Sequence, residues 1–306
     1  MPAIIQEALE NYGVDIHFIT GGTLTNLTFL SHALRPYEAV ISADTGHINT
    51  HETGAIEASG HKVLSIPCTD GKLTADLIRP VLKQHENEHW VEPRLVYISL
   101  PTELGTVYTK EELEKLYQFC KRHNLYLYID GARLAMALAV EETQLTLKDL
   151  PDLCDAFYIG GTKNGAMFGE ALILVNDDLK DHFRFNMKQR GAILAKGWMI
   201  GVQFEELFQD NLYLELGKRS VALAQRLKEG FIDCKIPFLC DSPTNQLFPI
   251  FPNEFAKKIN ENYVTTFQCK PDENHTCLRF CTSWATNEQA VEDFIKDLKQ
   301  WSYIYA

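Results

Sequence analysis

The sequence lacks the features that mark membrane, secreted and nucleic-acid-binding proteins. No apolar run approaches the roughly 20 residues that a membrane-spanning helix needs. Residues 1–7 contain neither a basic segment nor a long apolar stretch, so no signal peptide is expected. The net charge of -12 at pH 7 argues against a basic surface for nucleic acid. These absences favour a globular protein that handles small molecules.

The sequence also lacks paired cysteines. None of the eight cysteines has the Cys-x-x-Cys spacing of many metal and redox sites. A chain of 306 residues can build a core without disulfide bonds. We therefore expect reduced thiols, most of them small apolar core residues, in a cytoplasmic protein.

Strand-like and helix-like segments alternate along the first part of the chain. Seven short apolar segments predict strands, at residues 14–20, 39–42, 62–66, 94–100, 125–129, 156–159 and 171–175. Helical spacing of apolar residues lies between several of them, and Thr109 with Glu112 forms a capping-box pattern before a helix. The alternation predicts an α/β fold, in which helices cover both faces of a mainly parallel seven-stranded sheet.

The pattern changes in the last third of the chain. A long helical pattern covers residues 191–208, and an amphipathic helix is predicted near the end, over residues 287–299. Short strand-like runs lie between these segments. We therefore predict a large domain over residues 1–212 and a small α+β domain over residues 213–306.

The first candidate site is Gly21-Gly22-Thr23, between a predicted strand and a predicted helix. Glycine lets a ligand approach the backbone closely, and a helix N-terminus favours a phosphate group. A plain turn explains the same residues. The spacing matches neither the dinucleotide-binding nor the nucleoside-triphosphate-binding glycine pattern, which disfavours both of those ligands.

Two further candidates follow predicted strands. Asp130 ends the apolar run 125–129, and a carboxylate there needs a partner such as a protonated pyridine nitrogen; a helix cap is the alternative. Lys163 lies in the glycine-rich loop 160–165, where a desolvated amine could form an imine; a solvated loop lysine is the alternative. A phosphate cradle, a pyridinium carboxylate and an imine lysine together are what pyridoxal phosphate needs.

These residues also carry a resemblance to a known family. The stretch 128–134, the lysine loop and the segment 43–47 resemble the threonine aldolase branch of the β-eliminating lyases, over about residues 14–284. The resemblance implies the pyridoxal-phosphate-dependent transferase (aspartate-aminotransferase-like) fold and a homodimer or homotetramer. It also implies the cleavage of L-threonine or L-allo-threonine to glycine and acetaldehyde.

The resemblance assigns roles to individual residues. It implies that the phosphate is held at Gly22 and Thr23, the pyridine nitrogen by Asp130, the Schiff base by Lys163, and the ring face by His47, which is also the candidate base. It places Arg133 near the substrate carboxylate or the cofactor, and Arg279 on the substrate carboxylate.

The sequence departs from the family pattern in three places. The segment before the first core strand is short, which suggests a truncated form. Lys188 stands where many members have an arginine that reaches the phosphate, and we expect it to act as a point charge. Thr162 stands where many relatives have a serine before the lysine, so it is expected to supply that hydroxyl group.

Other functions remain open at this stage. His47 and His51 are four residues apart, but no third ligand has suitable spacing, so no metal site is predicted. We interpret Glu52 as a charge at the start of a helix. Another pyridoxal-phosphate reaction, such as β-elimination or transamination, and a truncated non-catalytic cofactor-binding protein are the alternative functions.

Overall fold

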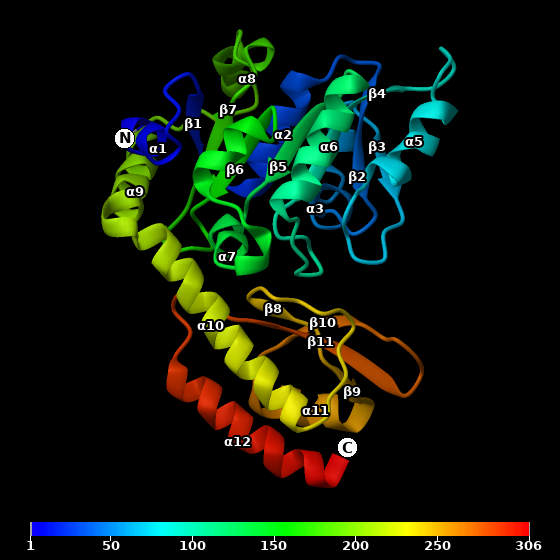
Figure 1. The fold of residues 1–306 in the computed structure, drawn as a ribbon, viewed down its shortest axis with the longest axis vertical. Helices are drawn as coiled ribbons and strands as arrows, with labels where there is room; N and C mark the ends of the chain where they lie inside the picture. Colours follow the sequence, from blue (N-terminus) through cyan, green and yellow to red (C-terminus); the bar gives the residue numbers. More distant parts are fainter. Residues whose placement is uncertain (1, 306) are drawn as a thin grey trace.

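A seven-stranded sheet forms the centre of the larger part of the molecule (Figure 1). The computed structural model describes residues 2–305, and the side chains of residues 2–304. The strands are β1 (Asp15–Ile19), β2 (Glu38–Ala43), β3 (Val63–Ile66), β4 (Glu92–Ser99), β5 (Tyr126–Asp130), β6 (Ala156–Gly160) and β7 (Glu170–Leu174). Their order is β1-β7-β6-β5-β4-β2-β3; β7 runs antiparallel to both of its neighbours, β1 and β6, and all the other neighbouring pairs are parallel. The predicted mainly parallel sheet is confirmed.

Helices cover both faces of this sheet. They are α1 (Pro2–Ala8), α2 (Gly22–Ala33), α3 (His47–Thr50), α4 (Ala55–Ala58), α5 (Ala75–Gln84), α6 (Lys110–Arg122), α7 (Leu134–Leu138), α8 (Phe183–Gln189), α9 (Trp198–Phe208) and α10 (Leu212–Asp233), with 3-10 turns at Glu141–Thr143, Leu147–Asp152, Asp177–Leu179 and Gln209–Asn211. Phe29 of α2 and Phe183 of α8 pack in one apolar cluster, and Phe119 of α6 and Phe204 of α9 pack in another. Because both faces are covered, the central strands are mostly apolar and are buried along their length.

A smaller α+β part follows along the chain. It contains β8 (Gln246–Leu247), β9 (Ile250–Pro252), β10 (Thr266–Cys269), β11 (His275–Cys281), α11 (Asn253–Asn262) and α12 (Glu288–Tyr305). Its antiparallel sheet packs on helices around a third apolar cluster, which includes Phe231, Phe251 and Phe294. Figure 1 shows α10 running from the larger part into the smaller one, and it packs against α7 and α12. The domain boundary near residue 212 stays a prediction; residue 212 is where α10 begins.

One predicted helix is shorter than expected. The helical pattern from residue 191 gives a helix only from Trp198, because Gly191 adopts a φ of 75°, which a right-handed helix does not allow. Ile193 supplies one of the apolar positions in that pattern, and it packs against the core from a loop. Among the helices that the structure describes, none is long and apolar enough to cross a membrane.

Candidate active site

A cavity of about 210 Å³ lies where the carboxyl ends of the parallel strands face the smaller part of the molecule. Figure 1 shows β8, β10 and β11 on the far side of this region from β5 and β6. The cavity is lined by His47, His51, Ser99, Pro101, Thr102, Glu103, Asp130, Ala132, Arg133, Lys163, Gln246 and Arg279. Ligands of open α/β sheets collect at this edge, as the sequence argument assumed.

Five of the predicted site residues line this one cavity: His47, Asp130, Arg133, Lys163 and Arg279. They come from α3, the end of β5, the turn after β5, the loop after β6, and β11. The fold thus brings together five residues that are spread along the chain from position 47 to position 279. The other four predicted residues, Gly22, Thr23, Thr162 and Lys188, are not among the residues that line it.

The Asp130 carboxylate is buried and held by three donors. Its Oδ2 accepts hydrogen bonds from the Asn26 side chain at 3.0 Å and the Tyr97 hydroxyl at 2.6 Å. Its Oδ1 accepts one from the backbone N–H of Ala132 at 3.0 Å. These bonds set its orientation and leave capacity for one more donor, because a carboxylate has about four acceptor sites. This donor set fits a protonated ring nitrogen.

Lys163 lies in the loop between β6 and β7, and its amine is desolvated. Burial lowers the pKa of this amine, and the charge of Arg133 lowers it further, against the opposing charges of Asp130 and Glu170. An amine with a lowered pKa has more of the neutral, nucleophilic form at neutral pH. The residue therefore suits covalent attachment to a carbonyl group.

Glu170 holds the lysine loop, and it is not among the residues predicted from the sequence. Its Oε2 accepts a hydrogen bond from the Gly161 backbone N–H at 2.8 Å. Burial raises the pKa of this carboxyl to about 7, although hydrogen bonds from Thr162 and Gly161 oppose the shift. A single acidic residue at the start of the apolar strand β7 was the available signal.

His47 is oriented by Glu52, which was also missed. The His47 Nδ1 lies 2.8 Å from Glu52 Oε1, and Asn26 donates to the same oxygen at 2.7 Å. Burial alone would lower the pKa of His47, but the hydrogen bond to Glu52 and the charges of Asp130 and Glu52 raise it. The interpretation of Glu52 as a charge at a helix start was wrong, because α3 begins at His47 and ends before Glu52.

The surroundings of His47 include a histidine and three acids. His51 stacks on His47 with ring centroids 5.4 Å apart, and burial and neighbouring positive charges lower the pKa of His51. Ligand atoms of His47, Glu52 and Asp130 lie within 4.8 Å of one another, a grouping that sequence spacing did not indicate. The Asn26 side chain already links the two carboxylates by donating to both, and His47 bonds to Glu52.

Glu103 is a third acid at the site, and it is not among the residues predicted from the sequence. Its Oε1 accepts hydrogen bonds from the Ser99 hydroxyl at 2.6 Å and from the backbone N–H of His47 at 2.8 Å. Burial raises the pKa of this carboxyl. Glu103 thus ties the turn after β4 to the first residue of α3.

Arg133 and Arg279 bring two positively charged side chains to the cavity. Burial and the charge of Arg133 hold the pKa of the Arg279 guanidinium below its ordinary value. Among the described residues neither guanidinium forms an ion pair, and the buried Arg279 Nε has no hydrogen-bond partner. Two guanidinium groups without an acidic partner are well suited to bind the carboxylate of a ligand.

The first turn of α2 could hold a phosphate group. The helix hydrogen bonds begin with Thr25 N–H to the Gly21 carbonyl, so the N–H groups of residues 22–24 have no acceptor in the described chain. The Thr162 hydroxyl accepts a hydrogen bond from the Gly169 N–H at 3.1 Å, and Lys188 is exposed on α8. The predicted roles of Thr162 and Lys188 stay predictions.

Comparison with known proteins places the chain in a family. The model of the β-eliminating lyase family matches residues 6–251. The chain belongs to the β-eliminating lyase family. It is 30% identical to the low specificity L-threonine aldolase of Pseudomonas aeruginosa, over 93% of this chain and 82% of that protein.

Solved structures agree with this membership. A Leishmania major threonine aldolase structure is 51% identical, with a TM-score of 0.96, and the match covers 98% of this lyase and 87% of that chain. A Thermus thermophilus aspartate aminotransferase is 13% identical with a TM-score of 0.70, and it covers 99% and 81% of the two chains. The second likeness concerns the fold alone, and it confirms the predicted aspartate-aminotransferase-like architecture.

Proposed function

We propose that this lyase cleaves L-threonine or L-allo-threonine to glycine and acetaldehyde with pyridoxal phosphate as its cofactor. The names of the similar proteins support the reaction. One observation on this chain carries the proposal. The desolvated amine of Lys163, the oriented carboxylate of Asp130 and two unpaired guanidinium groups line the same cavity.

The residues present fit the cofactor. Asp130 would hold the ring nitrogen, Lys163 the carbonyl carbon, and the first turn of α2 at Gly22 and Thr23 the phosphate. His47 would cover one face of the ring. When bound, the cofactor supplies an electron-poor ring that takes up the electron pair of the broken Cα–Cβ bond.

The remaining residues position the substrate. Arg279, with Arg133, binds the amino-acid carboxylate, which directs the Cα–Cβ bond relative to the ring. The Nδ1 of His47 is bonded to Glu52, which leaves Nε2 as the atom that accepts the proton of the β-hydroxyl group. Glu52 then stabilises the charge that His47 acquires.

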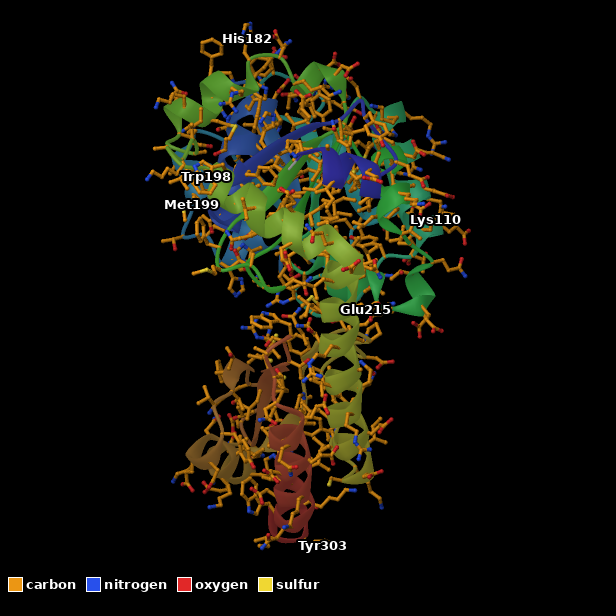
Figure 2. The ribbon with its side chains drawn as sticks, turned by 90° about the vertical axis from the view of Figure 1, so that its left-hand side faces the viewer. Lys110, His182, Trp198, Met199, Glu215 and Tyr303 are labelled. Carbon is orange, nitrogen blue, oxygen red and sulfur yellow. The ribbon has the colours of Figure 1, made fainter. Side chains whose placement is uncertain are left out.

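We also propose that the lyase works as a homodimer or homotetramer in the cytoplasm. Exposed apolar side chains gather on α9, namely Trp198, Met199 and Val202. The exposed Met167 lies beside this helix, because its backbone N–H donates to the Gln203 side chain at 2.7 Å. Figure 2 shows Trp198 and Met199 beside each other on the outer surface. We call these four residues the α9 patch. A second copy on the patch would cover the lysine loop. The free state of all eight cysteines supports the proposed cytoplasmic location.

The test is acetaldehyde release from L-threonine by the purified protein with pyridoxal phosphate. We expect release by the wild type and its loss in Lys163→Ala, because Lys163 is the only lysine among the described residues that line the cavity. Lys299→Ala, which removes an exposed lysine paired with Asp233, is the control and should release acetaldehyde normally. Undiminished release in Lys163→Ala, or formation of pyruvate from serine without cleavage of threonine, would contradict the proposal.

A further inference from the structure

Tyr158 places a hydroxyl group beside the first turn of α2. A Cβ built on Gly22 would lie 3.1 Å from the Tyr158 hydroxyl oxygen, so the two groups are in close approach. Tyr158 is only 1% exposed as a residue, and among the described residues its hydroxyl forms no hydrogen bond, although its oxygen is not one of the fully enclosed polar atoms. The hydroxyl therefore has a free hydrogen-bonding capacity beside Gly22, at the start of α2.

Of three comparable tyrosines on neighbouring strands, only Tyr158 has a hydroxyl group without a hydrogen bond to the described residues. Tyr97, Tyr128 and Tyr158 lie on the adjacent strands β4, β5 and β6, and all three are buried. The Tyr97 hydroxyl donates to Asp130 at 2.6 Å, and the Tyr128 hydroxyl donates to Asn26 at 3.0 Å. Two of the three hydroxyl groups therefore have protein partners, and the one nearest the α2 turn does not.

The charge state of this hydroxyl suits an anion. Burial and the charges of Asp130 and Glu170 raise the pKa of Tyr158 well above its ordinary value, so the group keeps its proton and can donate. The helix end offers the free N–H groups of residues 22–24 and the positive end of the α2 dipole. A phosphate bound there would meet a neutral donor from the sheet as well as donors from the helix.

We propose that the Tyr158 hydroxyl donates a hydrogen bond to the phosphate group of the cofactor bound at the first turn of α2. The inference rests on the proposed function, which supplies the phosphorylated ligand. It makes Tyr158 a cofactor-binding residue that distinguishes the phosphorylated cofactor from pyridoxal, which has the same ring and aldehyde without the phosphate.

The test compares Tyr158→Phe with the wild type in titrations of the apoprotein with pyridoxal phosphate and with pyridoxal. Absorbance of the bound ligand gives both dissociation constants, without any need for turnover. We expect about tenfold weaker binding of pyridoxal phosphate by the variant, the usual effect of losing one hydrogen bond to a charged group. Pyridoxal affinity should not change, because that ligand has no phosphate.

Tyr128→Phe is the matched control. It removes a hydroxyl group from the next strand that is already bonded to Asn26, so it should change both affinities by the same factor. The apoprotein of Tyr158→Phe should also melt at the wild-type temperature or above, because the lost hydroxyl had no partner to lose. An unfolded variant would contradict that expectation and overturn the assignment.

The outcomes separate this inference from the proposed function. Equal ratios of the two dissociation constants in the wild type and in Tyr158→Phe would overturn the role of Tyr158 and leave the lyase proposal intact. A wild type that binds neither ligand would overturn the proposed function and this inference with it. A loss confined to pyridoxal phosphate supports the inference.

Discussion

The hydrogen bond between Glu52 and His47 gives a prediction for the pH dependence of the reaction. Glu52 raises the pKa of His47, so Glu52→Gln should lower that pKa. His47 can act as a base only when it is neutral, so a lower pKa lets it act at lower pH. The acid limb of the plot of kcat/KM against pH should therefore shift to lower pH. The turnover number should fall about tenfold or more, because the ring loses its orienting carboxylate.

The measurement is kcat/KM for threonine between pH 5 and 9. Glu57→Gln, on α4, is the control, because Glu57 is exposed and does not line the cavity. An acid limb that stays in place in Glu52→Gln would show that His47 is not the titrating group.

Glu170 gives a prediction for stability. Burial raises the pKa of this carboxyl from 4.5 to about 7, so the folded protein favours the protonated form. The stability that the protonated Glu170 contributes is fully present below pH 4.5 and is lost as the pH rises through 7. Gln does not titrate, so Glu170→Gln should gain stability relative to the wild type over this range, by about 3 kcal/mol at most.

Urea unfolding of the apoprotein at several pH values between 5 and 8 measures this difference. The charges nearest to Glu170 are Lys163 and Asp130, and both are present in the two proteins compared. The free energies of unfolding of Glu170→Gln and the wild type should diverge as the pH rises. Parallel curves would mean that Glu170 is ionised throughout.

Helix α6 gives a prediction for a single element. The capping box expected from Thr109 and Glu112 is confirmed: the Thr109 hydroxyl accepts from the Glu112 N–H at 3.2 Å, and the Glu112 carboxylate accepts from the Thr109 N–H at 2.8 Å. Thr109→Ala should lower the free energy of unfolding by about 1 kcal/mol. Thr109→Ser keeps the hydroxyl group and should therefore keep most of the stability that Thr109→Ala loses.

Urea unfolding measures this loss, and the acetaldehyde assay should give an unchanged KM because α6 does not line the cavity. Equal stability of Thr109→Ala and the wild type would show that Glu112 alone holds the helix start. Its carboxylate also pairs with Lys72 at 2.7 Å.

Local patterns in the sequence predicted the elements better than the contacts between them. Asp130 and Lys163 could be predicted because Asp130 ends one apolar strand of the parallel sheet and Lys163 lies in the glycine-rich loop after another. Asn26 and Asp130 are 104 residues apart, and no local pattern indicates that one side chain donates to the other. The same applies to Glu52 and Glu170, whose roles depend on how α2, α3 and the lysine loop pack. Apolar spacing likewise could not separate the loop at residue 193 from the helix that follows it.

At the scale of the whole molecule, the cavity depends on how the two parts meet. Gln246 and Arg279 reach it from the small antiparallel sheet, whereas Asp130 and Lys163 reach it from the ends of β5 and β6. α10 packs against α7 in one part and α12 in the other, so it sets their separation. Sequence patterns predicted both parts, but the geometry between them follows from packing along this helix.

The α9 patch gives a prediction for assembly. Trp198 is 59% exposed and Met167 is 87% exposed, and they lie with Met199 and Val202 in one patch, an arrangement typical of interaction sites. Trp198→Asp should shift the protein toward the 34.8 kDa monomer in sedimentation equilibrium, because a second copy would have to bury the new charge. Phe267→Asp is the control: Phe267 is 61% exposed on the edge strand β10, outside the patch, and its change should leave the mass unaltered.

Activity should follow assembly in the same variants. Met167 lies four residues after Lys163, so a partner that covers the α9 patch also restrains the lysine loop. We therefore expect the kcat of Trp198→Asp to rise with protein concentration as dimers re-form, while Phe267→Asp keeps a constant kcat. A dimer of unchanged mass in Trp198→Asp would place the subunit contact elsewhere. A monomer with full activity would show that the lysine loop holds its conformation without a second copy, through Glu170 and the Thr162 hydroxyl alone.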